Sequence, residues 1–184
     1  MKDVWQALSL LESEDAGVRA RASRCIADLG AACEPAIPEL VSLLKQEHLV
    51  LVDDVRIALQ KIGTPVVPEI MSRLESATGQ YRVNLLSVLS SDMEPFDQIM
   101  LAMTAALGEA DPAVRMQAAY SVVGFYFSAS EGERSSRDWS SVDIARSLLE
   151  QSKTDPATSH YWPSAQLCLR ELARLHRRNG AGHT

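Results

Sequence analysis

The stretch "PAIPELVSLL" at residues 35–44 returns as "PVVPEIMSRL" at residues 65–74. Both prolines, the glutamate, the serine and the apolar positions recur 30 residues further along the chain. Pro38 and Pro68 suit the first turn of a helix, where a backbone nitrogen has no intrahelical partner. Glu39 and Glu69 follow them, at the positive end of the helix dipole. The stretch therefore predicts a helix start that occurs once in each copy of a repeat.

Other segments fit a similar period. "LESEDAGVRAR" from Leu11 and "LESATGQYRVN" from Leu74 share their first three residues and an arginine, at an offset of 63. A further 33 residues on, "LGEADPAVRMQ" from Leu107 keeps the arginine. The copy from Leu44, "LKQEHLVLVDD", has Val52 in its place. Recurrence at this spacing is typical of proteins built from stacked structural repeats.

Each period contains two segments with helical spacing. In the first copy, Leu8 and Leu11 continue one apolar stripe, and an acidic turn follows. A second stripe, spaced i, i+4, i+7, runs from Val18 to Leu29 and stops at Gly30. One such helix hairpin cannot bury both of its apolar faces, so we expect neighbouring hairpins to stack and supply the core.

The second helix of the repeat carries Asp, then Val-Arg, then small and aliphatic residues. The residues are Asp15, Val18, Arg19, Ala22 and Ile26 in repeat one, and Asp111, Val114, Arg115, Ala118 and Val122 in repeat four. In this pattern, residues 3–126 resemble the HEAT-repeat family. Repeat three has Arg82 without the Asp, repeat two lacks the Arg, and a fifth unit has Trp162 where Arg is expected.

The resemblance implies an all-α fold, an α-solenoid of about five HEAT-like helix pairs in a right-handed superhelix, with second helices on the concave side. We expect one domain over residues 1–178, with repeats at about 3–33, 34–63, 64–95, 96–127 and 141–177. The segment 128–140 is rich in Ser and charge and is predicted to be an irregular loop. Residues 179–184 are predicted to be a disordered tail.

The recurring Asp and Arg could be interpreted as a catalytic pair, but a catalytic residue is needed only once. The resemblance instead implies that the aspartate caps the second helix and that the arginine reaches the turn of the neighbouring repeat. We therefore assign a structural role to the recurring set and predict no catalytic residue: Asp15, Arg19, Arg82, Asp111 and Arg115.

Motifs for cofactors and metals are missing from the sequence. It contains no glycine-rich phosphate loop and no GxSxG. The histidines are scattered and the three cysteines form no CxxC, so we expect free thiols and no metal site. Deoxyhypusine hydroxylase has a similar architecture but needs His-Glu pairs, and this sequence has no His-Glu dipeptide. Phycobilin lyases share the repeat style, yet nothing indicates a bilin. We predict no cofactor.

The net charge of -6 and a pI near 5.2 disfavour nucleic acid and anionic membranes as partners. No apolar stretch is long enough to span a bilayer, and the N-terminus lacks the apolar run of a signal peptide. We therefore expect a cytoplasmic protein with no membrane partner, and a monomer.

A candidate binding surface follows from the positions at which the repeats disagree. Aligned on the second helices, these positions vary while the buried ones stay aliphatic, and the stripe passes from basic to polar and aromatic. Arg and Tyr are common anchors in protein interfaces. The predicted concave stripe consists of Arg21, Arg24, Asp54, Lys61, Asn84, Ser87, Gln117 and Tyr120. A solvated face with no single partner is the alternative. Trp139 either docks on the fifth helix pair, which we favour, or contacts a partner.

The leading hypothesis is a non-enzymatic protein-interaction module that captures a partner protein on its concave face. A sharper version is a small regulatory or immunity-type protein that neutralises a basic partner. Two alternatives remain. One is a nucleic-acid-binding HEAT-like protein or DNA glycosylase-like enzyme that uses the basic N-terminal end. The other is a lyase-like subunit for a small ligand.

Overall fold

The computed structural model describes residues 4–46 and 49–180. Within these ranges the secondary structure consists of α-helices and short 3-10 helices, without strands, so the prediction of an all-α fold is confirmed. The chain divides into two compact units, Met1–Ile99 and Met100–Thr184, and each is described by itself. The expected single domain over residues 1–178 stays a prediction. No helix of the described ranges is long and apolar enough to cross a membrane.

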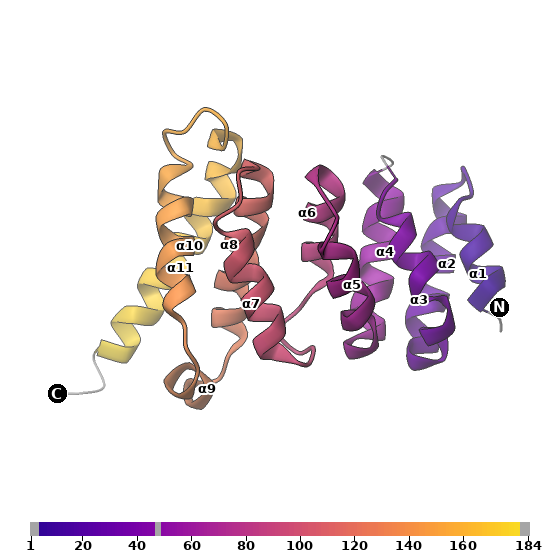
Figure 1. Ribbon diagram of the computed structural model, residues 1–184, viewed down its shortest axis with the longest axis horizontal. Helices are drawn as coiled ribbons and strands as arrows, with labels where there is room; N and C mark the ends of the chain where they lie inside the picture. Colours follow the sequence, from indigo (N-terminus) through magenta and orange to yellow (C-terminus); the bar gives the residue numbers. More distant parts are fainter. Residues whose placement is uncertain (1–3, 47–48, 181–184) are drawn as a thin grey trace. The chain divides into compact units, whose positions relative to one another are not determined.

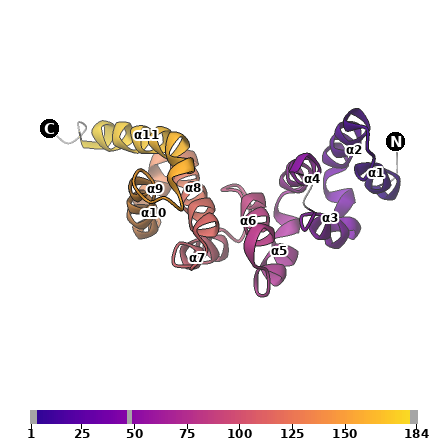
Figure 2. The ribbon, with the colours of Figure 1, turned by 90° about the horizontal axis from the view of Figure 1, so that it is seen from above.

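Unit 1 contains three helix pairs in two layers (Figures 1 and 2). The first helices of the pairs form one layer, in which α3 contacts α5, and the second helices form the other, with α2 on α4 and α4 on α6 (Figure 2). The first helices are α1 (Val4–Leu11), α3 (Ile37–Leu43) and α5 (Val67–Leu74). The second helices are α2 (Ala16–Leu29), α4 (Leu49–Ile62) and α6 (Gly79–Val88).

The two copies of the repeated stretch form the entries of α3 and α5, as predicted. Each entry is a 3-10 turn, η1 (Gly30–Ala36) or η2 (Thr64–Val66), followed by a proline and a glutamate in the first turn of the α-helix. Gly30 and Gly63 end the preceding helices with φ of 52° and 79°. These left-handed backbone conformations favour glycine and stop the helix.

The core of unit 1 lies between the two layers. Its large side chains come from every helix pair, because each helix contributes one apolar stripe. The fully buried large aliphatic residues are Leu11, Ile26, Leu40, Leu44, Leu59, Ile70, Leu85 and Leu86.

Unit 2 contains the remaining helices. The helix α7 (Phe96–Ala106) crosses the boundary between the units and lies beside α8 in both views (Figures 1 and 2). The helix α10 packs against α8 and α11, and α11 also contacts α8. The elements after α7 are α8 (Pro112–Ser128), α9 (Glu131–Ser136), α10 (Ser140–Gln151), η3 (Ser159–Tyr161) and α11 (Trp162–Gly180).

Two boundary predictions are wrong. The segment 128–140, predicted as an irregular loop, contains α9, because Ser130 and Glu133 form a reciprocal capping box that starts a helix. The helix α11 continues to Gly180, so residues 179 and 180 belong to a helix and not to a tail. The rest of the predicted tail, residues 181–184, lies outside the described residues.

Candidate functional site

The recurring aspartates cap their helices, as predicted. Asp15 accepts hydrogen bonds on Oδ1 from the backbone nitrogens of Gly17, at 2.7 Å, and Val18, at 3.2 Å. Asp111 accepts one from the backbone nitrogen of Ala113, at 2.8 Å. Both carboxylates satisfy donors that the first turn of a helix leaves without a partner. Both side chains are therefore used in helix capping.

Arg19 and Arg115 bind the turn of their own helix pair, and the prediction that they reach a neighbouring repeat is wrong. Arg19 donates from Nη1 to the carbonyl oxygens of Ser13 and Glu14, at 2.8 and 2.9 Å. Arg115 donates in the same way to Glu109 and Ala110, both at 2.7 Å. Helical side chains point toward the N-terminus of their helix, so these guanidinium groups cover the turn that comes directly before it.

Two further arginines have the same geometry. Arg82 donates to the carbonyl oxygens of Leu74 and Ala77, although its helix has no aspartate cap. Arg134 in α9 donates to the carbonyl oxygens of Tyr126 and Ala129, and the sequence analysis missed it. The signal that could have found it is the capping box "SEGE" four residues before the arginine.

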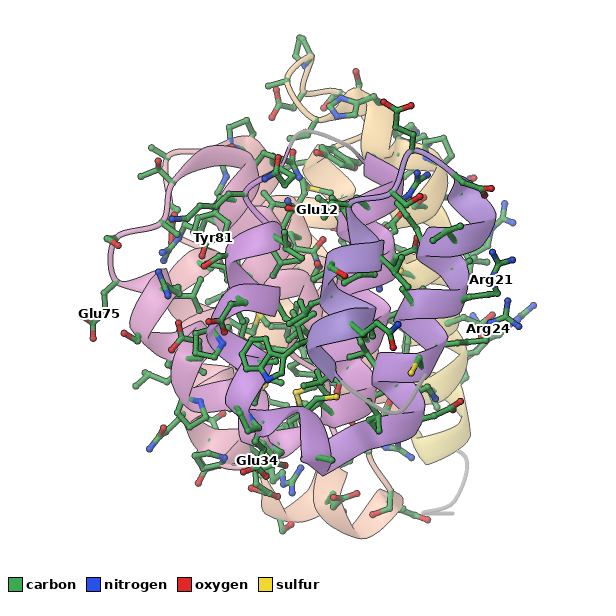
Figure 3. All side chains as sticks on the ribbon, turned by 90° about the vertical axis from the view of Figure 1, so that its right-hand side faces the viewer. Glu12, Arg21, Arg24, Glu34, Glu75 and Tyr81 are labelled. Carbon is green, nitrogen blue, oxygen red and sulfur yellow. The ribbon has the colours of Figure 1, made fainter. Side chains whose placement is uncertain are left out.

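On α2 the predicted stripe is exposed. Arg21 and Arg24 project together from one edge of unit 1, and the labelled glutamates point elsewhere (Figure 3). Beside them lies an open depression of about 410 Å³. Cys25, Asp28 and Leu29 complete its lining. Two guanidinium groups next to partly apolar side chains can bind a carboxylate while its apolar neighbours are buried.

On α4 the stripe continues with charged and apolar side chains. Lys61 is exposed, Asp54 is half-buried, and the apolar Ile57 is 44% exposed. A hydrogen bond of 2.7 Å from Ser23 Oγ to the carbonyl oxygen of Asp54 fixes α4 against α2. The two helices therefore hold these side chains on one packed support.

On α6 the stripe is not exposed, and the expectation for Asn84 is wrong. Asn84 is only 8% exposed, and its Nδ2 donates to the carbonyl oxygen of Leu44 at 2.9 Å. Ser87 is half-buried; its Oγ donates to the carbonyl oxygen of Asn84, and its own carbonyl oxygen accepts from Gln60 Nε2 at 3.0 Å. Both residues connect helix pairs, because α6 lies against α4 and the end of α3.

In unit 2 the two stripe residues of α8 are half-buried. Tyr120 donates its hydroxyl hydrogen to the carbonyl oxygen of Tyr161 at 2.9 Å, and the ring centroids of the two tyrosines are 6.4 Å apart. Burial, followed by the nearby Cys168, raises the pKa of Tyr120 to about 12. Gln117 donates to Ser121 Oγ at 3.2 Å. Tyr120 therefore holds η3 in place, and its hydroxyl stays neutral at ordinary pH.

Trp139 is half-buried and packs within unit 2. Its ring meets Tyr126 of α8 edge to face, with centroids 5.2 Å apart, and its Nε1 donates to the carbonyl oxygen of Glu133 at 3.4 Å. The side chain thus lies against α8 and α9. Its role toward a partner stays a prediction.

Groups for redox or metal chemistry are sparse in the described ranges. Cys33 and Cys168 form no disulfide, and burial raises the pKa of both, which makes their thiols less nucleophilic. Among described residues, no three or more His, Cys, Asp or Glu side chains gather as metal ligands would. His48 and His183 lie outside the described residues.

Comparisons with known proteins find distant structural likeness. No protein-family model and no curated protein matches the chain. Among solved structures, the chain is similar to an engineered protein from a structural genomics consortium, at 18% identity over 90% of this chain and 77% of that one, with a TM-score of 0.41. It is also similar to a designed armadillo repeat protein, at 15% identity over 89% and 79% of the two chains, with a TM-score of 0.40. The stacked helix pairs of unit 1 are themselves the reason to describe the chain as a helical repeat protein.

Proposed function

We propose that this chain is a HEAT-type repeat protein without a catalytic role, and that it binds a partner protein on the α2–α4 face. We define this face by Arg21, Arg24, Asp54, Ile57 and Lys61. The observation that carries the proposal is the contrast between the two sets of polar residues. The recurring Asp and Arg are occupied in holding turns and caps, whereas Arg21, Arg24 and Lys61 project into solvent.

The HEAT assignment rests on the second helices. An aspartate caps α2 and α8, and an arginine four residues later binds the preceding turn. Because the same bonds recur in separate helix pairs, they support one repeated hairpin design. They also support a structural role for these residues, which leaves the exposed, variable positions as the functional ones.

The charge of the α2–α4 face favours an acidic partner segment. Three cations, Arg21, Arg24 and Lys61, face solvent, against the exposed Asp28 beside them and the half-buried Asp54, so the positive charges are in excess. An exposed Ile57 adds apolar area that a partner could cover. We therefore propose an acidic segment with apolar residues for this face, in place of the basic partner that the net charge of -6 suggested.

Nucleic acid is the second candidate, since the same cations could bind phosphates. Asp28 lies in the lining of the depression with Arg21 and Arg24, and Asp54 follows on α4. A nucleic acid would bring a continuous row of phosphates against these carboxylates, whereas a protein segment can place its acidic side chains at the cations alone. A salt titration of DNA binding separates the two candidates, because phosphate contacts make the affinity fall steeply with salt.

Affinity capture from the native lysate tests the proposed function. We expect wild-type protein to recover one discrete protein, and Arg21→Ala/Arg24→Ala to lose it, because removing two exposed anchors costs an interface a large part of its binding energy. Lys45→Ala/Lys153→Ala is the matched control, since it removes two exposed cations that lie outside the α2–α4 face. Circular dichroism should show equal helicity for all three proteins. Equal recovery by the α2 variant and wild type would contradict the proposal.

A further inference from the structure

A second surface lies on the opposite layer of unit 1, between α1 and α3. It is an open groove of about 560 Å³. Its apolar lining includes Trp5, which is 49% exposed, with Leu8 and Leu43. An exposed Trp in a groove is a frequent anchor point of an interface. None of these residues belongs to the α2–α4 face.

Carboxylates give the groove a negative charge. Glu12, directly after α1, and Glu39 on α3 are exposed lining residues. No ion pair connects either of them to a cation elsewhere in the described part of the chain. The one cation of the lining, Arg73, is bound to Glu69 at 2.6 Å. The groove therefore fits a helix that combines an apolar residue with arginine or lysine.

The helix α11 carries a face of this chemistry. Leu167 is 62% exposed, and Arg170, Arg174 and Arg177 follow on the same side of the helix at spacings of three and four residues. Arg174 is paired with Glu171 on its own helix. Arg170 and Arg177 are exposed, and no ion pair joins them to another described residue.

We propose that the groove of unit 1 binds the Leu167–Arg177 face of α11 from a second copy of this chain. Trp5 on α1 and Glu12, the residue directly after α1, are seven positions apart, as are Leu167 and Arg174 on α11. That separation corresponds to about 10 Å along a helix. One alignment therefore brings Leu167 to Trp5 and Arg174 to Glu12, with the exposed Arg170 and Arg177 on either side of Arg174.

The contact uses different surfaces on the two copies. Such a heterologous contact leaves one groove and one α11 unused in each dimer, so association continues to larger species or to a ring. It differs from the monomer that the sequence analysis expects.

Sedimentation of the purified full chain at low and high salt tests this proposal. We expect the average mass to rise above 20.2 kDa with protein concentration at low salt and to fall back at high salt, because rim charges are screened. Glu12→Arg/Glu39→Arg and Arg170→Glu/Arg177→Glu should each weaken association by about tenfold or more, because like charges then meet across the contact.

Mixing these two variants should restore association, because each groove again faces an α11 of opposite charge; restoration also shows that both variants fold. The matched control is Glu34→Arg/Glu75→Arg, which makes the same change in net charge at exposed glutamates outside the groove (Figure 3). It should associate like wild type.

A mass of one chain at every concentration and salt would overturn the proposal. The proposal would also be overturned if either charge-reversal variant associated like wild type, or if mixing the two variants did not restore association. The Arg21→Ala/Arg24→Ala protein should self-associate normally, so a failure of this proposal is distinguishable from a failure of the proposed partner binding.

Discussion

Arg19, Arg82 and Arg115 show how a repeated residue can hold a fold. Each donates from one Nη atom to two carbonyl oxygens of the turn before its helix. The sequence allowed their structural role to be predicted, because they recur at one position of the alignment. It did not give the correct target, since that depends on the direction in which a helical side chain points.

Replacing Arg115 should lower the stability of the protein, because carbonyl oxygens in the turn before α8 lose their hydrogen-bond donor. Arg115→Met keeps the length of the side chain but leaves the carbonyl oxygens of Glu109 and Ala110 without their donor. We expect a loss of about 1.5–3 kcal/mol in the free energy of unfolding, as for other hydrogen bonds to charged groups. Urea denaturation measures it.

The control for this substitution is Arg24→Met, at an exposed arginine of α2. It should change the free energy of unfolding by less than about 0.5 kcal/mol. If both variants lost the same amount, the turn contacts would not be what makes Arg115 important.

At the scale of elements, polar side chains join neighbouring helix pairs. The side chains of Ser23, Gln60 and Asn84 donate hydrogen bonds to backbone carbonyl oxygens of α4, of α6 and of the end of α3, respectively. The sequence analysis interpreted Asn84 as an exposed binding residue. A polar residue beside an apolar stripe can face solvent or a neighbouring backbone, and only the packing of the next pair decides between them.

Asn84→Ala should weaken the junction between helix pairs. The substitution removes the donor to the buried carbonyl oxygen of Leu44, so we expect unfolding to become easier by about 1–3 kcal/mol. Ser87→Ala is the matched control, because the Ser87 hydroxyl bonds only within α6 and the bond from Gln60 goes to the Ser87 backbone. In thermal unfolding, the midpoint temperature should fall clearly for Asn84→Ala and only slightly for Ser87→Ala. The opposite order would exclude this role for Asn84.

For the whole molecule, the sequence predicts the fold class better than the site. The all-α fold was predictable because the period, the helix entries at Pro38 and Pro68 and the glycine stops are local signals repeated along the chain. Exposure of the proposed stripe agrees with the prediction on α2 and on part of α4. On α6 and α8, Asn84 and Tyr120 donate hydrogen bonds to backbone that is distant in the sequence, and no local sequence pattern predicts such bonds.

Site-specific photo-crosslinking tests the α2–α4 face most directly. A photoreactive side chain would replace Ile57 on α4 in one protein and Leu101 on α7 in another, because both are exposed apolar residues, at 44% and 72%. In native lysate, we predict that position 57 crosslinks to one discrete protein and that position 101 does not. Crosslinking at position 101 without crosslinking at position 57 would contradict partner binding on the α2–α4 face.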